Sequence, residues 1–505
     1  MSSDILLQNG VALIHDADNH VVPTKTNILI RDSKIVKIGA DAGEEGAKVI
    51  DCTDKIVSPG FIDTHHHGWQ TQLKGRHANE LLLEYMIGGN AQSYQFEPID
   101  TFYGQLSGML EAVAAGTTTV VDHAHSTYSP NHAKFGIAAT AASGVRGVYC
   151  YAPIMRIKSF NPLTYYPNPL EDWVMKTFSE LASQGPWANG RVTLGFAFDL
   201  LFFPSQVVQG IFKKVKDAGV KTITVHSNVS FQLGGGWGPG GAARQLKDLD
   251  LLDEHILISH SNDMKSEHVD LLRKANARVS ATPSTELQMT MTRPVCFDES
   301  FLGSEYVGAQ DHSSLGVDCH SNNAGSIVLE ARLGLQHARN NFNEYYIAQG
   351  KTTKTLPESL SVEAAFNLAT IKGAEAARME KEIGKIAVGM KADLAIFDAL
   401  SPAMVAAAQH DPVAAVILHS SPADIEIVII DGVVRKRDGK LLEVTMEGDA
   451  KDIVGKEAMT WTEVAKKVLG SRERIQGEID KIDFADAAEV IKKMYRVDDA
   501  KFAEL

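Results

Sequence analysis

Pro59-Gly-Phe-Ile-Asp-Thr-His-His-His-Gly68 is an apolar segment that ends in three consecutive histidines. In an extended strand, residues two apart point to the same side. The side chains of His65 and His67 can therefore face one point, while His66 faces away. Two imidazoles that converge at the end of one strand make half of a metal site. An isolated His-x-His pair also arises by chance, so a metal site can be predicted only if other segments supply further ligands.

Three other predicted strands also end in residues that bind metals. The runs 221–225 and 255–259 are followed by His226 and His260, and the run 313–318 ends in Asp318. Each of these residues alone has a simpler explanation, because a buried histidine can be hydrogen-bonded in a core and an aspartate can cap a helix. Catalytic groups of β/α barrels lie at the carboxyl ends of the strands. Four such strand ends in one chain therefore predict a metal site inside a barrel.

Short apolar runs alternate with helical patterns through the middle of the chain. Eight runs lie at 57–64, 117–122, 145–151, 192–198, 221–225, 255–259, 277–282 and 313–318. Helical patterns lie between most of them, for example at 99–115, 206–218 and 326–340. Eight strand–helix units predict an α/β fold with a (β/α)8 barrel of the TIM type. An open doubly wound sheet gives a similar pattern, and the polar strand ends favour the barrel.

Strand-like segments at both chain ends predict a second, smaller unit. Residues 1–57 contain short alternating runs between turn formers, and the same pattern returns in 383–447. We expect these two segments to pair into one small β-sandwich domain beside the barrel of residues 58–382. Residues 448–505 are charged and helix-prone, with Trp461, Val464, Val468 and Leu469 at helical spacing. This pattern predicts a helical C-terminal extension that docks on the protein or on another subunit.

Composition excludes some classes of partner. The chain has 505 residues and a formal net charge of −14, which disfavours nucleic acid and anionic membranes as partners. Its four cysteines are far apart and form no Cys-x-x-Cys pair, as expected in a reducing compartment. The N-terminal segment lacks the basic and apolar regions of a secretory signal. We therefore expect a cytoplasmic protein.

With these motifs in place, the chain resembles the amidohydrolase superfamily, in the branch of cytosine and guanine deaminases and triazine hydrolases. The resemblance runs from the His-x-His strand through Gly116-Thr-Thr-Thr-Val-Val-Asp122 and the strand-end residues to the segment 384–398. That last segment resembles the closing strands of the family. The resemblance implies a barrel with an adjoining β-sandwich and a metal-dependent hydrolase.

The resemblance also implies roles for individual residues. His65, His67, His226 and Asp318 would bind one divalent metal, with Zn²⁺ expected and Fe²⁺ or Mn²⁺ as alternatives. Such a site lowers the pKa of water towards neutrality. Asp318 would also accept the proton of the attacking water, and His260 would hydrogen-bond this water or the substrate.

Two positions depart from the family pattern. Two-metal members carry a bridging lysine at the end of the fourth strand, but here Thr193-Leu-Gly-Phe-Ala-Phe-Asp199 has none, which favours one metal. Aromatic deaminases carry a proton-shuttling glutamate three residues after the fifth-strand histidine, where this chain has Val229. Glu286, after the seventh run, could act as a catalytic substitute or be a solvated loop residue.

Aromatic and polar residues after the strands are candidates for the pocket wall. They suit a flat or partly apolar substrate, although each could instead be ordinary loop packing. The predicted substrate contacts are Trp69, Gln70, His123, Met155 and Trp237.

These observations predict a mononuclear metal-dependent hydrolase that cleaves a C–N bond of an amide, amidine or aromatic amine in a small cyclic compound. The absence of the shuttle glutamate leaves a lyase, decarboxylase or isomerase open, as well as a dechlorinating hydrolase. A non-catalytic binding protein is disfavoured by the full ligand set. We expect a homo-oligomer, either a dimer or a tetramer.

Overall fold

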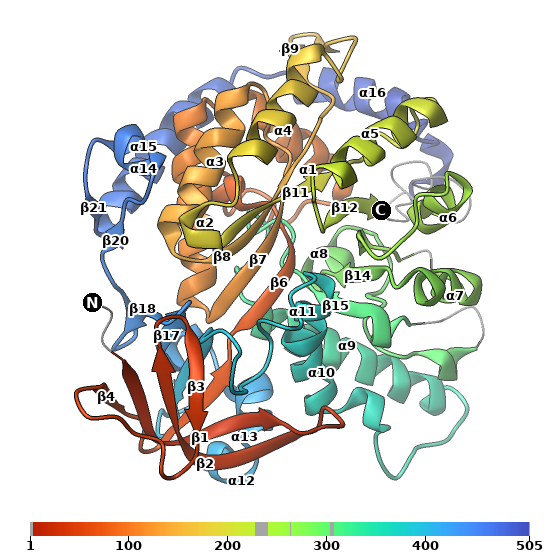
Figure 1. The fold of residues 1–505 in the computed structure, drawn as a ribbon. Coiled ribbons are helices and arrows are strands. Elements are labelled where there is room, and N and C mark those ends of the chain that lie inside the picture. The colour runs from red at the N-terminus through yellow and green to blue at the C-terminus, as the bar shows by residue number, and fades with distance from the viewer. Residues whose placement is uncertain (1–3, 228–240, 263, 304–307, 504–505) are drawn as a thin grey trace.

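The computed structural model describes residues 4–227, 241–262, 264–303 and 308–503. Figure 1 shows a barrel with helices around it, a sheet at its lower end and a helical C-terminal segment along its side and top. Within the described residues, none of the helices has the length and apolar character needed to cross a membrane.

Eight parallel strands form the barrel, in chain order around the ring. Hydrogen bonds close the ring between its first and last strands, because the backbone N–H of Asp318 donates to the carbonyl of His65 (2.8 Å) and that of His67 donates to the carbonyl of Asp318 (3.1 Å). The predicted barrel is therefore confirmed. Its strands are β6 (Phe61–His66), β7 (Thr117–Ala124), β8 (Arg146–Tyr151), β11 (Val192–Ala197), β12 (Ile223–Ser227), β13 (Ile256–His260), β14 (Arg278–Ala281) and β15 (Ser313–Leu315).

The apolar run 57–64 is two strands instead of the predicted one. Strand β5 (Lys55–Pro59) belongs to the lower sheet, and β6 starts the barrel after Gly60. A Cβ at Gly60 would lie 2.1 Å from the hydroxyl oxygen of Thr118, so only glycine fits where the chain passes from one sheet to the other.

Helices cover the outside of the barrel with their apolar faces inward. In α5, the buried residues Val208, Ile211, Phe212 and Val215 recur at helical spacing and pack on the strands. The larger helices around the barrel are α2 (Pro98–Ala114), α3 (Pro130–Ser143), α4 (Asp172–Gln184), α5 (Ser205–Asp217), α6 (Gly241–Asp248), α7 (Ser266–Ala275), α9 (Ile327–Ile347) and α10 (Val362–Ala369). Shorter helices are α1 (Leu82–Gly88), α8 (Pro283–Gln288), α11 (Ile371–Ala376), α12 (Ala407–His410) and α13 (Pro412–Ala414), and a hairpin of β9 (Ile157–Phe160) and β10 (Leu163–Tyr165) follows β8.

Both chain ends build the lower sheet, as the sequence predicts. Central strand β16 pairs with β5 on one side and β17 on the other. Leu394 and Ile396 pack in the small core of this unit, whereas Ala395 and Phe397 pack in the cluster under the barrel. The sheet therefore fixes the barrel from below. Its strands are β1 (Ile5–His15), β2 (Val21–Arg31), β3 (Lys34–Ile38), β4 (Lys48–Asp51), β5, β16 (Leu394–Asp398), β17 (Ile425–Ile430), β18 (Val433–Arg437) and β19 (Lys440–Leu441).

The C-terminal extension packs on the barrel. It contains β20 (Val444–Thr445), α14 (Asp449–Val454), β21 (Ala458–Met459), α15 (Trp461–Ile479) and α16 (Phe484–Tyr495). The buried face of α15 carries Val464, Val468, Ile475 and Ile479. Trp461 and Leu469, which the sequence pattern placed on that face, are 42 % and 63 % exposed. The docking face is thus rotated relative to the predicted one.

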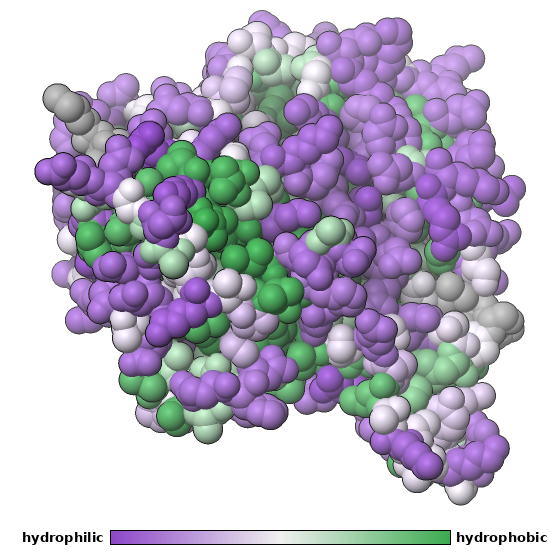
Figure 2. All heavy atoms as spheres, turned by 60° about the horizontal axis from the view of Figure 1, so that its bottom comes forward, coloured by the Kyte–Doolittle hydropathy of each residue, from purple (hydrophilic) through white to green (hydrophobic). Residues whose placement is uncertain are grey.

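Apolar side chains gather on the surface below the barrel. Figure 2 shows them in a band on the face that comes forward from the bottom of Figure 1.

Candidate metal centre

Side chains from four strand ends converge inside the upper end of the barrel. One donor atom each from His65, His226, His260 and Asp318 lies within 4.8 Å of all the others. Nε2 of His67 also reaches this point, 3.0 Å from Oδ1 of Asp318, and Nε2 of His65 lies 3.2 Å from the same oxygen. The structure thus brings together all the residues that we expected to bind the metal, with His260 beside them.

Hydrogen bonds orient three of these imidazoles in the same way. In His65, His67 and His226 the Nδ1–H faces an acceptor, so that Nε2 carries the lone pair. The acceptors are the hydroxyl of Ser259 (2.7 Å), the carbonyl of His123 (2.8 Å) and Oδ2 of Asp199 (2.8 Å), respectively.

This arrangement fits a divalent cation. Nε2 of His65 is buried and has no hydrogen-bond partner among the residues that the structure describes. Nitrogen lone pairs that point at a carboxylate oxygen repel it unless a positive charge lies between them. Two ligands at about 2.0 Å from a tetrahedral metal are about 3.3 Å apart, and the nitrogens of His65 and His67 lie 3.2 and 3.0 Å from Oδ1 of Asp318.

Asp318 has an uncommon backbone conformation and a carboxyl group with a shifted pKa. Its φ is +64°, in the left-handed region that non-glycine residues adopt only uncommonly. Burial raises the pKa of this carboxyl group, but its close contacts with the rings of His65 and His67 hold the pKa well below the usual value. Asp318 is therefore an anion near neutral pH.

Glu286 lies behind His260. Its Oε1 is 3.3 Å from Nδ1 of His260 and accepts the backbone N–H of Thr282 at 3.0 Å. The other ring nitrogen, Nε2, faces Oδ2 of Asp318 across 4.0 Å. Burial lowers the pKa of His260, but the hydrogen bond with Glu286 and the charge of Asp318 raise it above its usual value. This geometry suits a positioning residue better than the shuttle that the sequence suggested for Glu286.

Asp199 is a site residue that the sequence analysis missed. Its Oδ1 accepts the backbone N–H of His226 (2.9 Å), and its Oδ2 accepts both His226 Nδ1–H and Nε2–H of His123, at 2.8 and 3.2 Å. The strand-end rule that found Asp318 also applies to Asp199, which directly follows the run 192–198.

The residues predicted to contact the substrate differ in burial and in hydrogen-bond partners. His123 is 1 % exposed, with its ring nitrogens facing Asp199 and Thr224. Trp69 is 1 % exposed and donates its Nε1–H to His125 at 3.3 Å. The amide of Gln70 is buried between Tyr85 and Ser321. Met155 is half-buried. Their contacts with substrate stay predictions, and Trp237 and Val229 lie outside the described residues.

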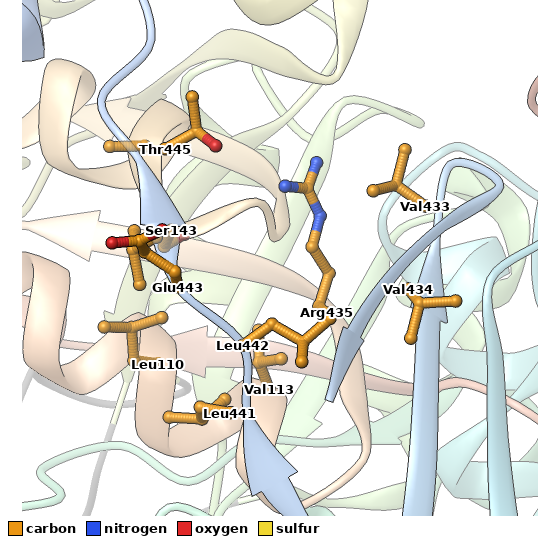
Figure 3. A pocket seen from close by; sticks show the side chains of 12 residues that line it. Leu110, Val113, Ser143, Val433, Val434, Arg435, Leu441, Leu442, Glu443 and Thr445 are labelled. Atoms are coloured by element: carbon orange, nitrogen blue, oxygen red, sulfur yellow. The ribbon is translucent and has the colours of Figure 1, made fainter. Parts of the chain in front are cut away.

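A pocket of about 150 Å³ lies elsewhere, between α2, α3 and the segment 433–445. Figure 3 shows the side chain of Arg435 extending between Ser143 and Val433. Apolar residues Leu110 and Leu441 line its base. This pocket belongs to the junction of the lower sheet with the barrel, away from the strand ends that carry the histidines.

Comparison with known proteins adds independent information. A sequence model described as the amidohydrolase family matches residues 56–435. The chain is 25 % identical to a 5'-deoxyadenosine deaminase of Methanobrevibacter smithii over 466 residues, which cover 88 % of this chain and 96 % of the relative. It is also 25 % identical to a 5-methylthioadenosine/S-adenosylhomocysteine deaminase of Acetivibrio thermocellus, with 93 % and 96 % covered.

Solved structures share the fold. An adenosine deaminase from Xanthomonas campestris with bound zinc aligns with a TM-score of 0.75 and 17 % identity, covering 94 % of this chain and 99 % of that one. An atrazine chlorohydrolase from Arthrobacter aurescens complexed with zinc aligns with a TM-score of 0.69 and 17 % identity, covering 92 % and 100 %.

Proposed function

The chain belongs to the amidohydrolase family, and we propose that it uses one divalent cation to hydrolyse the bond between an amino group and a small heteroaromatic ring. The observation that carries this proposal is the convergence of three imidazole lone pairs and the Asp318 carboxylate on one point. His65, His67, His226 and Asp318 would hold the cation, and we propose zinc because nitrogen-rich four-ligand sites favour it.

When bound, such a cation would lower the pKa of a coordinated water towards neutrality and so supply a hydroxide nucleophile. The residues of the chain would then transfer the protons and orient the water and the substrate. Oδ1 of Asp318 faces the histidines, which leaves Oδ2 to take a proton from the attacking water. His260, held by Glu286, points its Nε2 to the same place and can donate to the oxygen or nitrogen on the attacked carbon.

The proposed reaction balances with these two residues. The water oxygen bonds to the ring carbon, and one of its protons passes to Asp318, which delivers it to the amino nitrogen as the C–N bond breaks. The second proton of the water passes from the new hydroxyl, by way of His260, to the ring nitrogen, so that the hydroxyl becomes a carbonyl. Ammonia and a ring carbonyl are the products. Asp318 and His260 thus perform the proton transfers that the missing glutamate, at Val229, performs in related deaminases.

The substrate class follows from the relatives. Both curated relatives named above are deaminases of adenosine derivatives, so we propose an amino-substituted purine or a similar fused or single heteroaromatic ring. Val229 favours a second candidate, hydrolysis of a C–Cl bond or a lyase-type step, because chloride is expelled as an anion and carbon–carbon cleavage releases no amine. Neither product needs the proton that an amino group takes up on leaving.

A product assay tests the proposal. Zinc-loaded protein would be offered adenosine, 5'-deoxyadenosine, guanine, cytosine, melamine and atrazine, and ammonia and chloride would be measured. Ammonia release that is lost in His65→Ala and kept in His20→Ala, a control at an exposed histidine paired with Glu363, would support it. Chloride release alone would favour the second candidate, and no metal-dependent release would refute the first.

Assembly and location remain part of the proposal. We propose a homo-oligomer, a dimer or a tetramer, since monomeric proteins rarely expose large apolar patches like the band in Figure 2. Light scattering after size exclusion tests this, and a monomer at micromolar concentration would contradict it. The four cysteines, all in described parts of the chain, are free and buried, which supports the proposed cytoplasmic location.

A further inference from the structure

Helix α16 packs on the loops that surround the metal centre. Its buried residues Ala487 and Ile491 belong to one apolar cluster with Leu82 of α1, Ile157 of β9 and Cys319. These partners follow β6, β8 and β15, which are strands whose carboxyl ends point to the site. Figure 1 shows α16 at the upper end of the barrel, opposite the lower sheet. The helix therefore stands over the mouth of the barrel.

The turn before α16 is fixed to the same region. The side chain of Asn161 donates to the carbonyl of Lys481 (2.9 Å) and accepts the backbone N–H of Asp483 (3.2 Å). Asp483 in turn accepts the N–H groups of Ala485 and Asp486 as the N-cap of α16. These bonds tie the helix to the β9–β10 hairpin and set its direction.

Tyr495, the last residue of α16, continues the packed face one turn beyond Ile491. Burial raises the pKa of its phenol to about 12, and the negative charge of Asp199 adds to the rise. Tyr165, at the end of β10, packs against the same apolar cluster as Ala487 and Ile491 of α16. Yet Tyr495 is 37 % exposed. Because α16 packs at the mouth of the barrel through Ile491, one turn earlier, the solvent-exposed Tyr495 lies at the rim of that mouth.

We infer that α16 is a wall of the substrate pocket and that Tyr495 contacts the substrate, which makes the C-terminal extension a determinant of specificity. Both phenols stay protonated at neutral pH, so they offer hydrogen-bond donors as well as flat apolar faces. That combination suits a heteroaromatic substrate with polar edges. This reading of the substrate rests on the proposed function, whereas the place of α16 at the mouth does not.

Kinetics and metal extraction test the contact. We expect Tyr495→Ala to raise KM for the best substrate at least tenfold, with kcat changed less than threefold. The KM of Tyr495→Phe should lie between the values for Tyr495→Ala and the wild type. The flat chelator 1,10-phenanthroline should remove zinc several-fold faster from Tyr495→Ala. The matched control is Met494→Ala, at the neighbouring position, which is 43 % exposed and should behave like wild type.

A cross-linking experiment separates this inference from the proposed function. With the metal removed, the double variant Asp199→Cys/Tyr495→Cys should be joined by a short phenylene bismaleimide, whereas Asp199→Cys/Met494→Cys should react less. Cross-linking of this pair, together with no C–N hydrolysis by the zinc-loaded wild-type protein in the product assay, would keep the wall and refute the reaction. Equal cross-linking of both pairs, or wild-type KM and zinc loss in Tyr495→Ala, would overturn the inference even in an active deaminase.

Discussion

Replacing Asp199 by asparagine should weaken metal binding about tenfold. The two oxygens of Asp199 accept three N–H groups, two from His226 and one from His123. The amide nitrogen of asparagine cannot accept, so at least one of these donors loses its partner. A hydrogen bond to a charged group contributes about 1.5–3 kcal/mol and a neutral one about 0.5–1.5 kcal/mol.

The expected loss can be worked out from these values. If the hydrogen bonds from the two imidazole rings to this side chain each weaken by about 1 kcal/mol, the loss in metal-binding free energy is at most about 2 kcal/mol. The side chain of Asp199 is 31 % exposed, and water compensates part of the loss. About 1.4 kcal/mol then remains, which is a factor of ten in dissociation constant and the lower end of the range for residues that orient metal ligands.

Competition with a chromophoric zinc chelator would measure this dissociation constant. The matched control is Asp253→Asn, because Asp253 also accepts the backbone N–H and lies 3.1 Å from Nδ1 of a histidine, His255, at the start of β13 and far from the centre. Zinc affinity within twofold of wild type in Asp199→Asn, or an equal loss in Asp253→Asn, would refute the reasoning.

Three further predictions concern stability. Gly316→Ala would place a methyl group 2.8 Å from the backbone of β6 where the barrel closes, and it should lower the free energy of unfolding by about 1–3 kcal/mol. The control Gly210→Ala, whose added methyl group meets no described atom within 4 Å, should leave stability unchanged. Equal Tm values of the two variants in calorimetry would contradict this prediction. Burial raises the pKa of Glu330 from 4.5 to about 8, so the free energy of unfolding should fall as pH rises from about 4.5 through 8, and Glu330→Gln should flatten that fall in urea titrations; an unchanged slope would argue against it. Ile479→Ala, at a side chain that packs with Trp69, should cost about 2–5 kcal/mol and shift tryptophan emission, while exposed Leu469→Ala should do neither.

Local patterns in the sequence were enough to predict the barrel and the strand ends at which the histidines and Asp318 converge. The alternation of side chains in β6 places His65 and His67 on one side, and the strand-end rule places His226, His260 and Asp318. Both depend on neighbours in sequence and on a regular strand. The structure agrees because these residues lie at or just beyond the carboxyl ends of parallel strands of the ring.

Other features depend on contacts between distant segments. Glu286 lies one helical turn after Thr282, and this turn directs it to the back of His260 instead of the pocket. The buried face of α15 is determined by Trp69 and its neighbours, which pack against Ile475 and Ile479 and leave the similarly apolar Leu469 exposed. Such choices are made by tertiary packing, which sequence periodicity does not report.

Anomalous diffraction from a zinc-soaked crystal tests the central claim most directly. The account predicts one strong peak per chain, at about 2.0–2.2 Å from Nε2 of His65, His67 and His226 and from a carboxylate oxygen of Asp318. A map without a peak at this point, or with its main peak at another carboxylate–imidazole group, would contradict the metal centre on which the proposed hydrolysis depends.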